Sequence, residues 1–372
     1  MAHIRRARSG QGWEARYRDP HGKERARTFN TKRDAQQFIA GAEADLQRGD
    51  WLDPRVGRIR FDDWADEWLA TAVHLKPNTR YGYERLLERH VLPVFGGKRI
   101  ANIERIDVRR FVSDMTTAGM AAGTVRNAFT VVRNVFNIAL DSGAVKANPC
   151  ARVKMPRSPR AEMLFLDPAQ IVALAEAIGD EYALLVKTAA YTGLRAGELQ
   201  ALRVRRVDLD KCNLDVVESL SEVEGQLIFG ETKTYSRRQV GVPASLAAEL
   251  RLHITTRSLG PDDLVFAGPR GGPMRHNNFY NRHFKPAVVR GALPDGLRFH
   301  DLRHTCAALL ISEGAHPRAI MERLGHSTVQ VAIDRYGHLF PRIHAELTDS
   351  LDKLYRGGHD DPTSAGATSS DG

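Results

Sequence analysis

The sequence predicts a multidomain α+β protein: a small N-terminal sheet-plus-helix module, an all-α second domain, and a mixed, mainly α third domain with a short antiparallel sheet. Its 372 residues correspond to two or three domains of the usual size of about 100–200 residues. A hydrophobic content of 42% is sufficient for packed cores. Along the chain, apolar residues first alternate as in strands and then recur at helical spacing, and a basic stretch with prolines interrupts the pattern.

The N-terminal module is predicted from alternation and turn residues. Apolar and charged residues alternate over residues 12–18, as in a half-buried strand. Turn residues at 19–22 lead into a return strand, and Thr31 can cap a helix that ends near Gly49. We therefore expect a three-stranded sheet backed by one helix over residues 1–55, with arginines on the exposed face of the sheet.

The charge of the chain predicts a polyanionic partner. The net charge is +9, and the first 33 residues hold ten Lys or Arg against three acids. Such a concentration favours nucleic acid, and a two-stranded ribbon can enter the major groove. The alternative is a solvated sheet that only needs polar residues outside. The predicted DNA-contacting residues are Arg5, Arg6, Arg8, Arg16, Arg18, Lys23, Arg25, Arg27, Arg126 and Arg133.

The second domain, residues 59–147, reads as all helix. Phe61, Trp64 and Trp68 recur at helical spacing, which favours burial over stacking on DNA bases. Further helices are predicted at 77–90, 105–117 and 121–142.

A basic linker with three prolines is predicted at 148–161, because it contains no acid. The third domain, 162–356, opens with Asp167 as the cap of a helix and contains two or three strands between 206 and 242. The Gly-, Ser- and Thr-rich tail, 357–372, is predicted to be disordered.

The cysteines and the apolar runs indicate the cellular compartment of the protein. Three distant cysteines leave one unpaired in any disulfide scheme, and no Cys-x-x-Cys pair suggests zinc. The basic N-terminus has no apolar stretch of a signal peptide, and no apolar run reaches the roughly 18 residues of a membrane span. We expect a cytoplasmic protein with reduced thiols and no membrane association.

The third domain also carries dispersed residues that suit phosphodiester chemistry. Each short motif alone is weakly specific, but their order is informative. Arginine matches two phosphate oxygens with its rigid, charged fork, and tyrosine can act as a covalent nucleophile. The residues are Arg195, Lys233, His300, Arg303, His326 and Tyr336, with Glu198 as an accessory.

Chemical type suggests a role for each of these side chains. Glu198 lies three residues after Arg195, so on a helix it can orient the guanidinium. The Tyr336 hydroxyl, with an ordinary pKa of about 10, needs a base, and His300 is the natural one. Lys233 can protonate the leaving 5′ oxygen, and His326 can donate to a non-bridging oxygen.

Other assignments of these residues stay open. Tyr280 and Tyr355 are rival nucleophiles that lack the flanking motifs. His300 and His304, at i and i+4, could bind zinc, although the second position of that motif is Asp301 instead of glutamate. His304 and His338 otherwise read as structural or supporting residues.

These motifs resemble the tyrosine recombinase family, the phage-type site-specific integrases. The six residues fall on the catalytic positions of the family and Glu198 on its acidic accessory position. Residues 1–55 resemble the arm-type DNA-binding module of the larger integrases, 59–147 the core-binding domain and 162–356 the catalytic domain. Nearly the whole chain is covered.

The resemblance implies a reaction without metal, ATP or other cofactor. Tyr336 would attack the scissile phosphate of double-stranded DNA, forming a 3′-phosphotyrosyl bond, and strands would be exchanged through a Holliday junction in a homotetramer on core and arm sites. It implies integration, and with a helper excision, of a phage or mobile element, on the nucleoid of a bacterial host. The need for a host DNA-bending protein and an excision directionality factor stays open.

Four other functions are compatible with parts of the sequence. A chromosomal dimer-resolving recombinase typically lacks the N-terminal module, and a type IB topoisomerase would not need it. A DNA-binding protein with an inactive site is disfavoured because all six side chains are present. A zinc hydrolase would be sensitive to chelators.

Overall fold

The computed structural model describes residues 2–8, 10–49, 51, 53, 55–157, 163–232, 237–337 and 343–357. The chain divides into two compact units, Met1–Arg160 and Ala161–Gly372. The break lies within the predicted linker, of which residues 158–161 are outside the described residues.

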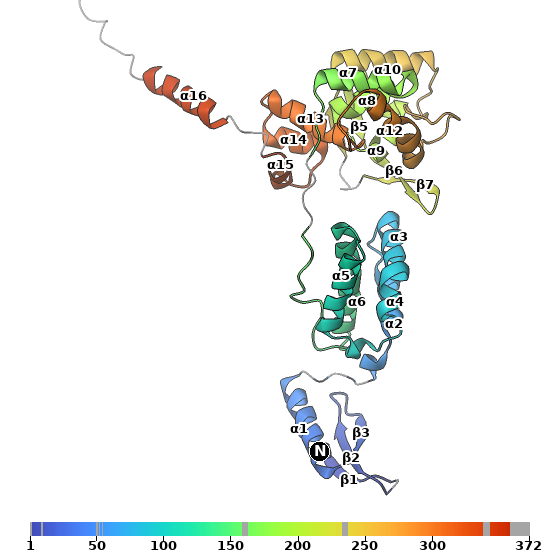
Figure 1. Ribbon diagram of the computed structural model, residues 1–372, viewed down its shortest axis with the longest axis vertical. Helices are drawn as coiled ribbons and strands as arrows, with labels where there is room; N and C mark the ends of the chain where they lie inside the picture. The colour runs from blue at the N-terminus through green and yellow to red at the C-terminus, as the bar shows by residue number, and fades with distance from the viewer. Residues whose placement is uncertain are drawn as a thin grey trace, which may run out of the picture. The chain divides into compact units, whose positions relative to one another are not determined.

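The N-terminal part of the first unit is a three-stranded antiparallel sheet backed by one helix, as predicted (Figure 1). The central strand, β2, pairs with both neighbours. Thr31 caps the helix by accepting from the Asp34 N–H at 3.1 Å, and Gly49 ends it in the left-handed conformation. The elements are β1 (His3–Arg6), β2 (Trp13–Arg18), β3 (Glu24–Phe29) and α1 (Lys32–Arg48).

The rest of the first unit is helical (Figure 1). The predicted helix 105–117 has these bounds in the structure, whereas the predicted helix 77–90 continues through a π turn to Phe95. Trp64 and Trp68 are buried in the core, as their spacing predicted. The elements are η1 (Val56–Arg58), α2 (Phe61–Thr71), α3 (Pro77–Leu86), η2 (Leu87–Val91), α4 (Leu92–Phe95), η3 (Ile100–Asn102), α5 (Arg105–Thr117) and α6 (Ala122–Asp141).

The second unit packs helices around a small sheet. Asp167 begins α7 by accepting from the Gln170 N–H at 2.8 Å, and Gln170 returns a bond to the Asp167 N–H. The helices are α7 (Pro168–Ile178), α8 (Asp180–Thr192), α9 (Ala196–Gln200), η4 (Val204–Arg206), α10 (Ala244–Thr256), α11 (His276–Phe279), η5 (Tyr280–Phe284), α12 (Lys285–Arg290), α13 (Asp301–Ser312), α14 (Pro317–Leu324), α15 (Val329–Tyr336) and α16 (Ile343–Gly357).

The prediction of two or three strands in the second unit was too low. The described residues form five strands, and the prediction missed a hairpin. Glu224 and Gly225 both have positive φ and close the tight turn between its two strands. The strands are β4 (Val207–Asp208), β5 (Asn213–Val216), β6 (Glu218–Val223), β7 (Gln226–Glu231) and β8 (Arg238–Gly241). They make an antiparallel sheet in the order β4-β5-β8 and the separate hairpin β6-β7.

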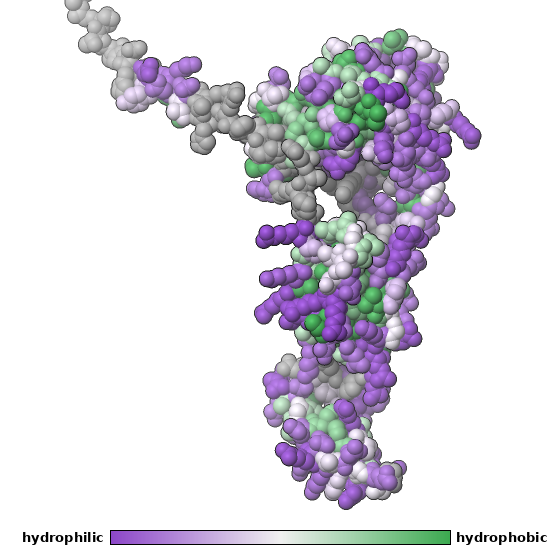
Figure 2. Space-filling model, viewed as in Figure 1, coloured by the Kyte–Doolittle hydropathy of each residue, from purple (hydrophilic) through white to green (hydrophobic). Residues whose placement is uncertain are grey.

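The face of the molecule drawn in Figure 2 is largely hydrophilic. Figure 2 shows hydrophilic side chains projecting from the helical part of the first unit, and hydrophobic surface restricted to patches. None of the described helices is long and apolar enough to cross a membrane. The predicted tail lies outside the described residues from 358 onwards, while the helix α16 precedes it.

Candidate active site and nucleic-acid interface

Arg195 lies at the start of α9, directly after the turn that ends α8. Gly193 ends α8 in the left-handed conformation at φ 69°, and Arg195 then caps α9. Glu198, three residues on, accepts from the Arg195 backbone N–H at 2.8 Å and from the guanidinium Nη1 at 2.9 Å. The structure thus places Glu198 against the guanidinium, as the spacing predicted.

Glu198 has a second cationic partner that the sequence reading missed. Arg238, at the start of β8, donates two bonds to the Glu198 carboxylate, at 3.0 and 2.7 Å. The Glu198 side chain is fully buried and that of Arg238 is 8% exposed. Burial alone would raise the pKa of Glu198, but hydrogen bonds and charge from Arg238 and Arg195 outweigh it and hold the pKa below its usual range.

Arg195 and Arg303 are the two arginines predicted to bind the phosphate, here called the clamp. Arg303, on α13, is the more deeply buried of the two. It is 3% exposed and donates to the carbonyls of Gly193, at 2.6 Å, and Leu324. Burial and the positive charge of Arg195 lower the pKa of Arg303 to about 9. A cation held in this way is stabilised by an anion placed beside it.

Three arginine side chains donate hydrogen bonds to the turn that follows α14 and leads to His326. The carbonyls of residues 323, 324 and 325 accept in succession from Arg238, Arg303 and Arg195. The last carbonyls of a helix have no partner within it and carry partial negative charge, so guanidinium groups satisfy both needs. The turn and the clamp are therefore one assembly.

Tyr336 is held on this assembly by two histidines. Its hydroxyl lies 2.8 Å from Nδ1 of His304, and its ring stacks on that of His326 with 6.3 Å between centroids. Tyr336 is 1% exposed and packs in a small apolar cluster with Ala307, Ile320 and Leu324. The predicted nucleophile is thus within the site but is covered by protein.

The remaining predicted side chains occupy different surroundings. His300, the predicted base, is exposed at the start of α13, with its ring 5.0 Å from that of His304. Lys233 lies outside the described residues, between β7 and β8. Of the rival nucleophiles, Tyr280 stacks on Phe284 next to the main core, and Tyr355 is 70% exposed on α16.

Sequence reasoning missed Arg238 and gave His304 only a supporting role. Alternation could have found Arg238, because it shares a face of β8 with the buried Val240 while its neighbour Gln239 is exposed. The spacing of His304 shows only that it lies one helical turn from His300. Its contact with Tyr336 depends on where α15 packs, which no local pattern gives. His338 lies outside the described residues.

The zinc interpretation of the two histidines finds no further ligand among the described residues, where no group of three or more His, Cys, Asp or Glu could hold a metal. Nδ1 of His304 is engaged by the Tyr336 hydroxyl. The residues present therefore do not form a zinc site within the described chain.

The N-terminal arginines do not all share one face of the sheet, which corrects the prediction. In the observed register, Arg27 lies opposite the buried Ala15 and Arg25 opposite the buried Tyr17. Arg25, Arg27 and, by the same alternation, Arg6 therefore lie on the side of the sheet that α1 covers. The outer face carries Arg5, Arg16 and Arg18.

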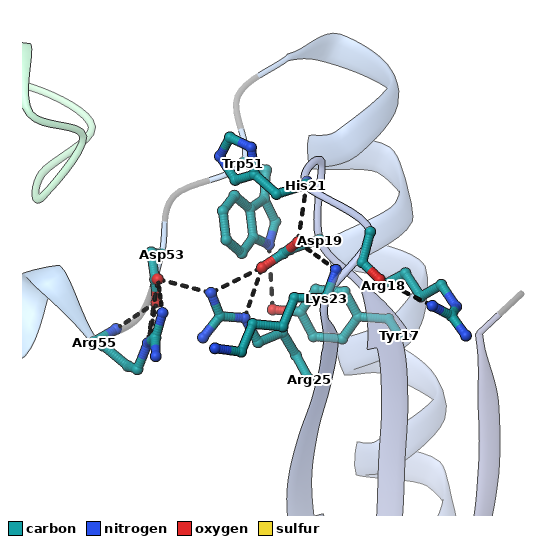
Figure 3. A network of polar contacts seen from close by, with 10 residues as sticks. Tyr17, Arg18, Asp19, His21, Lys23, Arg25, Trp51, Asp53 and Arg55 are labelled. Carbon is teal, nitrogen blue, oxygen red and sulfur yellow. Dashed lines mark hydrogen bonds and ion pairs between the residues drawn. The ribbon is translucent and has the colours of Figure 1, made fainter.

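Arg25 has a structural role (Figure 3). Its guanidinium donates to Asp19 at 2.8 Å and to Asp53 at 2.7 Å, and it lies over the Trp51 ring. The Asp19 side chain is 1% exposed. Hydrogen bonds from Arg55 hold the pKa of Asp53 below its usual range against the effect of burial, and Arg25 adds to this. This network ties β2 and β3 to the segment that follows α1.

Other predicted DNA contacts remain on the surface. Arg8 and Lys23 are exposed in the turns of the N-terminal sheet. Arg126 and Arg133 are exposed on α6, and seven residues apart they share one face of that helix. On the outer face of the sheet, Arg5 and Arg16 both pair with Glu14, which lowers the pKa of Glu14.

Comparison with known proteins covers almost the whole chain. The sequence matches the Phage integrase family over residues 165–342 and the phage integrase N-terminal SAM-like domain over residues 60–116. The putative prophage phiRv2 integrase of Mycobacterium tuberculosis is 30% identical over 367 residues, which cover 94% of this chain and 95% of the relative.

Solved structures share the fold. A Tn1549 transposon integrase in complex with a circular intermediate DNA has a TM-score of 0.67 at 21% identity, covering 74% of this chain and 94% of that one. A lambda integrase tetramer bound to a Holliday junction has a TM-score of 0.56 at 18% identity, covering 88% and 95%. With the site described above, these likenesses identify the chain as a member of the phage integrase family of tyrosine recombinases, enzymes of site-specific DNA recombination.

Proposed function

We propose that Tyr336 is the nucleophile with which this integrase cuts and rejoins DNA. Its hydroxyl oxygen attacks the scissile phosphorus, the bond to the 5′ oxygen breaks, and a 3′-phosphotyrosyl bond and a 5′-hydroxyl result. Attack by the 5′-hydroxyl of a partner strand reverses the step, so no external energy source or metal is consumed. The observation that supports this most is the convergence of Tyr336, His326 and the Arg195–Arg303 pair on one turn.

Arg195 and Arg303 hold the non-bridging oxygens of the scissile phosphate in this proposal. Both guanidinium groups are fixed by backbone carbonyls and so are oriented before DNA binds, which is the arrangement that stabilises developing charge best. Arg195 is 20% exposed at its side chain and Glu198 orients it. His326, beside Tyr336, donates to an oxygen of the phosphate.

Proton transfer is assigned to side chains on both sides of the phosphate. His300 takes the proton of the Tyr336 hydroxyl, and Lys233 protonates the leaving 5′ oxygen. A DNA with sulfur in place of that oxygen tests Lys233, because a thiolate leaves without a proton. Lys233→Ala should cleave ordinary DNA slowly and the sulfur-substituted DNA at nearly the wild-type rate. Equal impairment on both substrates would remove Lys233 from this role.

The parts of the chain divide the work of DNA binding. Residues 1–55 bind arm-type DNA through the outer face of the sheet, with Arg5, Arg16 and Arg18 directed at the groove and Arg8 in the adjoining turn. Residues 59–147 bind core DNA with Arg126 and Arg133, and 162–356 form the catalytic domain. The positive charge of these surfaces supplies the phosphate contacts.

Recombination requires several copies of the chain on two DNA sites. We place the protein in a homotetramer on core and arm sites, acting on nucleoid DNA in the cytoplasm. The exposed apolar residues Leu351 and Leu354 of α16 are available for contacts between copies. A host DNA-bending protein and a directionality factor would act by changing the DNA path between arm and core sites.

Joining of two DNA sites tests this function against its alternatives. A supercoiled plasmid with the two attachment sites from DNA flanking the gene is incubated with wild type and Tyr336→Phe. Circles of altered connectivity with wild type alone support an integrase. Relaxation without joining would indicate a topoisomerase, and binding without either product would indicate an inactive site.

A further inference from the structure

A third arginine, Arg238, is buried beside Arg195 and Arg303, and it contacts Glu198 and the turn after α14. Arg238 donates both terminal nitrogens to the carboxylate of Glu198 and its Nε to the Arg323 carbonyl at 3.0 Å. All three guanidinium nitrogens are thus engaged. The Arg238 side chain is 8% exposed, and both its terminal nitrogens pair with a fully buried carboxylate.

The two arginines hold Glu198 differently. Arg238 makes the two-nitrogen, two-oxygen pair that is the strongest geometry between these groups. Arg195 gives Glu198 one guanidinium nitrogen, Nη1, and directs Nη2 to the Gly325 carbonyl at 3.2 Å. Oε1 of Glu198 is shared between the two guanidinium groups.

The net charge of Glu198, Arg195 and Arg238 determines how much positive charge Arg195 presents to DNA. Glu198 carries one negative charge and faces two guanidinium groups, so the trio keeps a net positive charge beside Arg303. Without Arg238, a buried carboxylate would have Arg195 as its remaining ion-pair partner in this group, and its charge would cancel that of Arg195.

We propose that Arg238 is a positioning residue for DNA cleavage: it neutralises Glu198, so that Glu198 orients Arg195 without cancelling the charge that Arg195 presents to the scissile phosphate. This inference rests on the proposed role of Arg195 in the clamp.

The packing around Arg238 supports a fixed position. A Cβ on Gly325 would lie 3.1–3.2 Å from the Arg238 side chain, so a larger residue at 325 would displace the guanidinium by a few tenths of an ångström. Gly325 also has φ 62°, a conformation that favours glycine. The same turn carries the carbonyl that Arg195 contacts.

The test compares Arg238→Gln with the double variant Glu198→Gln/Arg238→Gln. The rate of covalent complex formation is measured in a single turnover on a nicked core duplex at saturating protein. Arg238→Gln should lose about 100-fold, as for removal of one charged group that supports a transition state. The double variant should recover at least about 10-fold of this loss, because the carboxylate that captures Arg195 is gone.

A substrate with a methylphosphonate at the scissile position gives a second measurement. This group lacks one negative charge, so the deficit of Arg238→Gln relative to wild type should shrink on it. Arg251→Gln, which breaks an exposed pair with Asp210, is the matched control and should cleave normally. Melting temperatures and DNA binding of every variant identify loss of folding.

Two results would overturn the proposal. One is normal cleavage by Arg238→Gln. The other is a double variant no faster than Arg238→Gln, with the same deficit on both substrates, which would mean a purely structural role. If Arg238→Gln does not fold, the test uses Arg238→Lys, which keeps the positive charge. Its loss of cleavage rate relative to wild type should be as large on the methylphosphonate substrate as on the phosphate substrate. A smaller loss on the methylphosphonate substrate would contradict the proposal. Failure of wild type to form an adduct in the same gel would instead refute the proposed nucleophilic chemistry.

Discussion

The Tyr336 hydroxyl lies 2.8 Å from Nδ1 of His304, in a position where Tyr336 is 1% exposed. A phosphate cannot approach a hydroxyl that protein covers, so the proposed attack by Tyr336 requires α15 to move relative to α13. The hydrogen bond to His304 and the apolar cluster around the ring both favour the covered position. The proposed nucleophile is therefore covered by protein in this structure, next to the side chains with which it is proposed to act.

Replacement of His304 should make Tyr336 more accessible. In His304→Ala the buried hydroxyl loses this hydrogen bond, which destabilises the covered position by about 1–3 kcal/mol. Nitration in the absence of DNA, followed by mass spectrometry, should show faster modification of Tyr336 than in wild type. Tyr355, which is 70% exposed, provides the internal control and should react equally in both. Equal protection of Tyr336 in the two proteins would contradict this account.

Loss of either clamp arginine should abolish cleavage and spare DNA binding. Arg195→Ala removes a guanidinium that carbonyl and carboxylate groups hold in place, and a decrease of about 100-fold or more is expected. Arg303→Ala should also lower the melting temperature, because the carbonyls of Gly193 and Leu324 lose a donor. Binding is measured by gel shift on core DNA. Cleavage near the wild-type rate would remove the residue from the clamp.

The turn at Gly193 should not tolerate a side chain. A Cβ there would lie 2.5 Å from Cδ2 of Leu324, and φ 69° is unfavourable for alanine. Gly193→Ala should therefore cost about 1–3 kcal/mol of stability and displace the carbonyl that Arg303 contacts. Gly230→Ala is the matched control, because nothing lies within 4 Å of its Cβ. Equal melting temperatures and cleavage rates for both variants would show that this turn is not constrained.

Two arginines of the N-terminal module should behave differently. Arg25→Ala leaves the buried Asp19 without its ion pair and should unfold the module, losing arm binding and protease resistance together. Arg18→Ala removes an exposed side chain of the outer face and should weaken binding to arm DNA while the module stays folded. Both variants should cleave a minimal core duplex normally. Intact folding and arm binding in Arg25→Ala would contradict the structural role of Arg25.

Sequence periodicity predicted the elements well where local rules determine them. The helix at 105–117, the cap at Asp167 and the burial of Trp64 and Trp68 follow from spacing and capping within a few residues. The six candidate catalytic residues were chosen from local motifs, and their catalytic roles stay predictions. The contact between Glu198 and Arg195 was predictable for the same reason, since both lie on one helical turn.

The missed features depend on contacts between distant segments. Alternation shows which residues of a strand share a face, but the register that puts Arg25 opposite Tyr17 is set by strand pairing. Arg238 meets Glu198 across 40 residues, and His304 meets Tyr336 across 32. These contacts require the packing of β8 on the α14 turn and of α15 on α13.

Covalent trapping on DNA tests the central claim most directly. Wild type and Tyr336→Phe are incubated in excess EDTA with nicked duplexes from the DNA flanking the gene, and the products are run on a denaturing gel. If Tyr336 is the nucleophile, an adduct forms with wild type alone and is unaffected by EDTA. An adduct that persists in Tyr336→Phe, or one that EDTA abolishes, would contradict this claim.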